Sequence, residues 1–183
     1  MSQVDVEVGM EVDPYLVPKE EFDEAGLLPQ GWYNWAFVSM KPTARTNKAG
    51  EVYHVIAGKL IASEKAVYSE DGELEEMVDL EVPKTKFNDF GITGDALQTL
   101  KSAYKTVTGR APTGTLNPET GRYEDIDVRL LADQLVGAKA WNVIIHREGK
   151  DANAGELFAN LGYTFKRQPP AKYVVKKPSK KEE

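Results

Sequence analysis

One β-rich segment of this chain combines many aromatic residues with a basic turn, a combination that suits the chemistry of nucleic-acid binding. The segment reads GWYNWAFVSMK, then the turn PTARTNKAG, then EVYHVIAGKLIAS. Aromatic rings stack on nucleobases while lysine and arginine contact phosphates, so a β-hairpin that carries both can hold a single strand. The candidate binding residues are Trp35, Lys41, Arg45, Lys48, Tyr53, Lys59 and Lys86. In this set the two aromatic residues would stack on bases and the five cations would follow phosphates.

These residues also have a purely structural interpretation. About half of the side chains of an alternating strand point inward, so we expect two of the four aromatic residues at positions 32, 33, 35 and 37 in the core. Lysine and arginine are mostly solvated surface residues, so only their convergence would define a site.

Catalytic and metal-binding patterns are absent from the sequence. It contains no Gly-x-Ser-x-Gly, no phosphate loop, no Gly-x-Gly-x-x-Gly and no His-Glu-x-x-His. It has no cysteine, which excludes thiolate zinc sites and cysteine nucleophiles. His54 and His146 lie in apolar runs without further ligands, and we expect them to be packed or hydrogen-bonded. The sequence therefore predicts no enzyme, no cofactor and no metal, with a hydrolase built on unpatterned carboxylates as the minor alternative.

The net charge of −6 is unevenly distributed. Residues 1–30 hold eight acidic residues and one lysine, whereas the remaining chain is close to neutral. A second acidic block spans Glu70 to Glu81, and the end of the chain is basic, with seven cations from Tyr163 onward. We therefore expect surface patches of opposite sign, of which a basic one can bind phosphate despite the total charge.

The elements that would position the candidate residues follow from periodicity and turn signals. Strands are expected within 31–41, 51–63, 77–82, 139–147 and 157–167, because apolar residues alternate there. A principal helix is expected from Asp95, as its cap, to Gly109, and a shorter one over 127–136 with Leu130, Leu131 and Leu135 inward. A surface loop should span 110–124. Gly58, in mid-strand, permits a bulge or bend.

This element order predicts the fold. Five strands with one principal helix between the third and fourth is the order of the oligonucleotide-binding (OB) barrel. The fold class is thus mainly β (α+β), a five-stranded OB-like barrel with extended N- and C-terminal arms. We expect an acidic arm over 1–28, the OB-like domain over 29–168, and a basic tail over 169–183, where Pro169 and Pro170 end regular structure.

Three segments resemble a known family. They are PQGWYNWAF with the turn TNKAGEVY that follows it, QLVGAKAWNVII, and FANLGYTFKRQPP. Together they are similar to small phage-encoded proteins of the OB-fold type that bind single-stranded DNA or accompany recombination, over about residues 28 to 170. The chain departs from this family in one respect: its acidic segment is at the amino end, whereas such phage proteins often have an acidic tail.

The resemblance and the hairpin imply the same function. We expect a phage-type single-stranded DNA-binding protein of replication or recombination, which contacts replication or recombination proteins through its acidic arm and can form a homo-oligomer. No apolar run approaches the ~20 residues of a membrane span, so we expect no membrane association and a location in the cytoplasm, that of the host if phage-encoded. The alternative is a virion or assembly protein whose terminal arms become ordered on neighbouring subunits.

Overall fold

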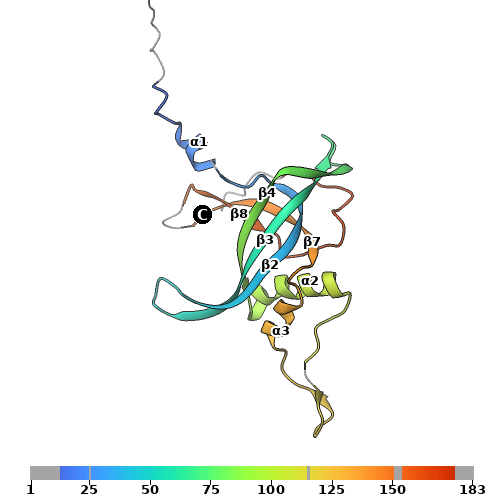
Figure 1. Ribbon diagram of the computed structural model, residues 1–183. Helices are drawn as coiled ribbons and strands as arrows, with labels where there is room; N and C mark the ends of the chain where they lie inside the picture. Colours follow the sequence, from blue (N-terminus) through green and yellow to red (C-terminus); the bar gives the residue numbers. More distant parts are fainter. Residues whose placement is uncertain (1–12, 25, 115, 151–153, 176–183) are drawn as a thin grey trace, which may run out of the picture.

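The main body of the protein is one antiparallel sheet that curls into a nearly closed barrel (Figure 1). The computed structural model describes residues 13–24, 26–114, 116–150 and 154–175. The sheet has the strand order β4-β3-β2-β7-β8. Its strands are β2 (Gly31–Thr46), β3 (Val52–Tyr68), β4 (Leu74–Gly91), β7 (Lys139–Glu148) and β8 (Leu157–Leu161). The remaining elements are α1 (Lys19–Glu24), η2 (Gly94–Ala96), α2 (Leu97–Thr108), β5 (Leu116–Asn117), β6 (Arg122–Tyr123) and α3 (Val128–Asp133).

The expected OB-like architecture is confirmed. The principal helix α2 lies between the third and fourth strands of the sheet, and β2 is the central strand. The two edge strands, β4 and β8, approach each other across the unpaired seam of the barrel. Side chains on both faces of a central strand can be covered, so both faces can carry bulky residues, and the first half of β2 does so.

All four aromatic residues of β2 are buried, and the expectation that only two would be is wrong. Tyr33, Trp35 and Phe37 point into the main core, with at most 3% of their surface exposed. Trp32 points to the opposite face of the sheet, where it forms a second apolar cluster with Trp141 and Val143. The C-terminal segment described below covers that cluster, so Trp32 is buried although it points away from the main core.

The strand β4 extends well beyond the expected end at Val82. Its pairing with β3 jumps from Asp79↔Glu64 to Lys84↔Ala62, so four residues of β4 oppose one of β3. Pro83 falls within this irregularity, on an edge strand, where no ladder N–H is required of it. Beyond it the pairing is regular as far as Gly91.

Gly58 provides space and does not introduce a bulge. The pairing of β3 with both neighbours is continuous at this position. A Cβ atom at Gly58 would lie 2.7 Å from Cε2 of Phe90 and 3.0 Å from Sδ of Met40. The glycine therefore lets two core side chains pack directly against the backbone of β3.

The helices differ from expectation at the start of α2, at the end of α3, which stops at Asp133 instead of Val136, and in one core residue. Asp95 lies in the 3₁₀ turn η2, ahead of α2, and gives no side-chain cap, whereas Gly109 ends the helix at φ 75° as expected. Asp127 caps α3, and its hydrogen bonds from Arg129 lower the pKa of its carboxyl to about 2. Leu130 is 59% exposed, so its predicted inward position is wrong. Leu131 and Leu135 are buried as predicted.

The C-terminal segment packs against the barrel beyond the boundary expected at residue 168. The Tyr68 hydroxyl donates to the Pro170 carbonyl at 2.7 Å, and the Tyr173 N–H donates to the Gly72 carbonyl at 2.7 Å. The rings of Tyr68 and Tyr173 lie 5.3 Å apart. Residues 169–173 are therefore part of the folded domain and cover the Trp32 cluster.

A chain that ends at residue 168 should unfold at a lower temperature than one that ends at residue 175. It loses the half-buried Tyr173 ring and three hydrogen bonds, those made by the carbonyls of Pro170 and Ala171 and by the Tyr173 N–H, together worth about 3 kcal/mol. At roughly 2 to 4 °C per kcal/mol for a domain of this size, the midpoint falls by several degrees. Thermal denaturation followed by circular dichroism measures this, and equal midpoints would restore the boundary at 168.

The segment ahead of β2 contacts the barrel at Leu28 and Pro29. Leu28 packs against the core, its carbonyl lies 2.7 Å from Nε2 of His146, and the Tyr33 hydroxyl donates to the carbonyl of Pro29. His146 is thus hydrogen-bonded as predicted, whereas His54 is exposed. Residues 1–12 and 25 of the acidic arm predicted over 1–28 lie outside the described residues. Within the described ranges no helix is long and apolar enough to span a membrane.

Candidate nucleic-acid interface

The candidate site lies on the outer face of β2, β3 and β4. Leu60 is buried in the core, and the side of Gly58 that would carry a Cβ faces core side chains. Lys59, between them, therefore points outward. Lys59 pairs with Ser39 on β2 and with Phe87 on β4. Side chains of directly opposed residues lie on the same face. Phe87 is 69% exposed, so a free aromatic ring lies beside a lysine on this surface.

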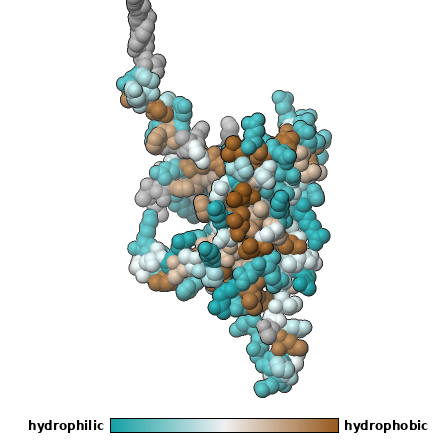
Figure 2. All heavy atoms as spheres, viewed as in Figure 1, coloured by the Kyte–Doolittle hydropathy of each residue, from teal (hydrophilic) through white to brown (hydrophobic). Residues whose placement is uncertain are grey.

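The same face continues toward the turn of the β2–β3 hairpin. The next outward positions are Lys41, opposite Ala57, and, further along, Tyr53, opposite Arg45. Tyr53 is 45% exposed. We call Lys41, Tyr53, Lys59 and Phe87 the outer patch. Figure 2 shows apolar surface interleaved with hydrophilic surface on this side of the barrel.

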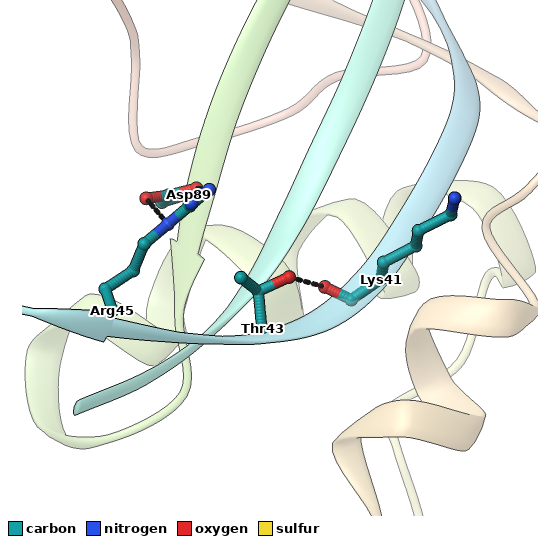
Figure 3. A network of polar contacts seen from close by, with 4 residues as sticks. All are labelled: Lys41, Thr43, Arg45 and Asp89. Atoms are coloured by element: carbon teal, nitrogen blue, oxygen red, sulfur yellow. Dashed lines mark hydrogen bonds and ion pairs between the residues drawn. The ribbon is translucent and has the colours of Figure 1, made fainter. Parts of the chain in front are cut away.

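Arg45 forms an ion pair and is not a free cation. Its Nε and Nη2 atoms donate to the two carboxylate oxygens of Asp89 at 3.1 and 3.0 Å (Figure 3). This bond, and the charge of Asp89, raise the pKa of the guanidinium above its ordinary value. Lys41 projects from the same strand as Arg45 but away from this pair. The prediction that Arg45 contacts phosphate therefore requires it to leave Asp89 or to bridge both anions.

Lys48 lies in the turn that closes the hairpin. Asn47 forms this turn: its side-chain oxygen accepts from the N–H groups of Ala49 and Glu51, while Gly50 has φ 82°. Pairing of β2 with β3 runs to Thr46↔Val52, whereas pairing of β3 with β4 starts only at Val55. The end of the hairpin is thus a two-stranded ribbon that extends past the barrel, with Lys48 in its exposed turn (Figure 1).

Two predicted site residues do not belong to the outer patch. Trp35 is 0% exposed and its Nε1 donates to the carbonyl of Asn142 at 3.3 Å, so it offers no stacking face and that prediction is wrong. Lys86 pairs with the core residue Leu60, which places it on the opposite face of β4 from Phe87. It is half-buried there, and the loss of solvent lowers its pKa.

Phe87 is the residue that sequence reasoning missed. The expected third strand ended at Val82, so no face was assigned to the residues after Pro83. The signal is present in the sequence: Thr85, Phe87 and Asp89 alternate with lysines and Asn88. An exposed aromatic ring beside a lysine has the composition of a stacking platform for a base.

The charge along the sheet changes sign. On the outer face Glu64 lies opposite Asp79, so the half of the sheet nearer the Ser69–Gly72 turn is acidic and the half nearer the hairpin ribbon is basic. This matches the expected patches of opposite sign. Among the described residues no three histidine, aspartate or glutamate side chains group closely enough to hold a metal ion.

No protein-family model matches this sequence, and no curated protein matches it either. The resemblance to phage single-strand binders therefore remains a prediction, and the outer patch is the structural feature that bears on function.

Proposed function

We propose that this protein binds single-stranded DNA through the outer patch, as a phage-type protein of replication or recombination. The observation that carries the proposal is the exposed Phe87 ring beside Lys59 on adjacent strands, β4 and β3. In an OB barrel the face of the second and third strands, with the loop between the first and second, is where oligonucleotides bind. Here those strands are β3 and β4, and that loop is the hairpin turn with Lys48.

Binding in this mode uses stacking and phosphate contacts. Bases stack on Phe87 and Tyr53, and each stacked base contributes about 1 to 3 kcal/mol without regard to sequence. Lys41, Lys59 and Lys48 neutralise phosphates along the path, which releases counterions and makes the affinity depend on salt. The acidic arm would serve as a contact for replication or recombination proteins, which fits a protein that acts in the cytoplasm of a host cell.

The test is a titration of fluorescently labelled oligo-dT of about 15 nucleotides, a length of the order of one OB site. All three tryptophans are buried, so anisotropy of the labelled strand is a better measure than tryptophan emission. We expect binding at about 50 mM salt that weakens strongly toward 200 mM. An unchanged anisotropy at the lower salt concentration would refute the proposal.

Replacing Lys41 and Lys48 by alanine should weaken oligo-dT binding about tenfold. It should also reduce the magnitude of the slope of log affinity against log salt by about 2, because each lysine–phosphate contact releases roughly one counterion on binding. The melting temperature should hardly change, because exposed turn charges contribute little to folding. A matched control is Lys139→Ala together with Lys105→Ala, two exposed lysines outside the patch and the hairpin. An equal loss in the control would show nonspecific charge attraction.

One observation favours the alternative of an assembly protein. The described residues of the N-terminal arm expose large apolar side chains, namely Tyr15, Leu16, Val17 and Phe22.

Deleting residues 1–27 should, under this alternative, abolish a higher oligomer measured by light scattering and leave DNA affinity unchanged. If instead the arm mimics a polyanion near the outer patch, the deletion removes its net charge of −7 and should tighten DNA binding, most strongly at low salt.

A further inference from the structure

A second binding feature lies at the seam between the edge strands β4 and β8. A cavity of about 230 Å³ opens there. Phe90 and Leu161, both core residues, supply its apolar base, and Asn88 and Asn160 line it from the two edge strands. Arg147 and Tyr163 also line it. The cavity thus combines an apolar base with polar groups from both strands.

The two amides are available to a ligand. Within the described parts of the chain, neither the Asn88 nor the Asn160 side chain has a hydrogen-bond partner, although both are partly buried. By contrast, both ends of the buried Asn142 side chain are used: Nδ2 donates to the Gly162 carbonyl and Oδ1 accepts from the Val143 N–H. A free side-chain amide has a donor and an acceptor next to each other. It can therefore form two hydrogen bonds with neighbouring groups on the edge of one nucleobase.

The opening of the cavity carries a cation and an aromatic ring that already contact each other. The guanidinium carbon of Arg147 lies 5.3 Å from the centre of the Tyr163 ring, and Nη1 donates to the Tyr163 hydroxyl at 3.3 Å. Tyr163 is 63% exposed. An arginine held over a ring keeps most of its donors free for a phosphate, which it can bind through two parallel hydrogen bonds.

The seam cavity adjoins a second cavity next to the outer patch. A wider cavity of about 530 Å³ lies beside Tyr53. Asp89, Gly91 and Ala96 line both cavities. A strand stacked on Tyr53 would therefore pass Asp89 to reach the seam.

We infer that the seam cavity takes one nucleobase of the bound strand, whose edge hydrogen-bonds to Asn88 and Asn160 and whose phosphate pairs with Arg147. This inference rests on the proposed function and adds base selectivity to it. The outer patch stacks any base, because every base has a flat face. The amides instead distinguish bases by the order of donors and acceptors along their edges.

The experiment compares the dissociation constants of labelled dT, dA and dC homopolymers of about 15 nucleotides for the wild type and the Asn88→Ala/Asn160→Ala variant. The wild type should prefer one homopolymer by about fivefold or more, the lower end of the discrimination given by one bidentate amide contact. In the variant this preference should disappear while the salt slope is retained. The control is Asn34→Ala, an amide on the outer face next to the acidic pair, and it should keep the preference.

The outcomes separate this inference from the proposed function. If the wild type binds all three homopolymers with the same affinity, the seam cavity takes no base and the inference is wrong, although the protein still binds single strands. If no homopolymer binds at low salt, the proposed function and the inference both fail. Should the double variant unfold, Asn160→Asp keeps the side-chain shape but removes its two donors, and it should change which homopolymer is preferred. An unchanged order of preference in Asn160→Asp would also contradict the inference.

Discussion

Replacing Phe87 and Tyr53 together by alanine should weaken binding of oligo-dT by about thirtyfold or more. Each ring offers one stacking platform, and two platforms at the lower limit of about 1 kcal/mol each correspond to roughly that factor. Both rings are substantially exposed, so their removal takes little apolar area out of the folded core. The melting temperature of the variant should therefore lie close to that of the wild type. Anisotropy titration and thermal denaturation measure the two quantities.

The chain offers a matched control for this variant. Tyr123, in the small β5–β6 hairpin, is 66% exposed, close to the 69% of Phe87, but it lies in a separate two-stranded sheet. Tyr123→Ala should leave the affinity unchanged. If Tyr123→Ala weakens binding as much as the double variant does, or if the double variant binds like the wild type, the outer patch is not the stacking surface.

Trp35→Ala should lower the free energy of unfolding by about 3 to 5 kcal/mol, the usual cost of deleting a large buried aromatic side chain. Trp35 packs 5.6 Å from the Tyr33 ring at the centre of the barrel, and its removal also leaves the Asn142 carbonyl without the indole donor. Urea denaturation measures the loss. A change below about 1 kcal/mol would contradict the central place of this residue in the core.

A conservative substitution separates the structural role of Trp35 from a binding role. Trp35→Phe keeps an aromatic ring and loses mainly the hydrogen bond and some volume, so the protein should remain folded but less stable. Its affinity for oligo-dT should equal that of the wild type, because the ring is enclosed by the core. A stable, folded Trp35→Phe protein with clearly weaker binding would return Trp35 to the list of binding residues.

Local patterns predicted much of the fold. Alternation of apolar residues located the strands, and Gly109 marked the end of α2 because a left-handed residue favours glycine. The order of strands and helix then predicted the barrel. What local pattern could not predict was the burial of Trp32, which depends on a segment more than 130 positions later in the chain. A strand that is bulky on both faces does not itself indicate what covers the second face.

The candidate site was predicted only in part. Which side chains belong to it depends on the face of the sheet that each one occupies, and that face depends on the register of strand pairing. Lys41, Tyr53 and Lys59 do share one surface. Trp35 and Lys86 were assigned to it from their type and proximity in sequence, but the pairing places both on the core side of the sheet. A register shift of one residue exchanges the two faces of a strand. The irregular pairing around Pro83 interrupts the alternation of the two faces along β4. The sequence alone therefore could not predict that Phe87 lies on the outer face and Lys86 on the core side.

The Arg45–Asp89 ion pair affects how much order the hairpin must gain on binding. An isolated two-stranded ribbon is only marginally stable, and the end of the β2–β3 hairpin has no third strand beside it. The ion pair ties β2 to β4 near the base of this ribbon, which narrows the range of orientations open to it in the free protein. A ligand that meets a ribbon already restrained in this way loses less conformational entropy on association. Asp89 can thus favour the binding of a polyanion through preorganisation, even though its own charge repels one.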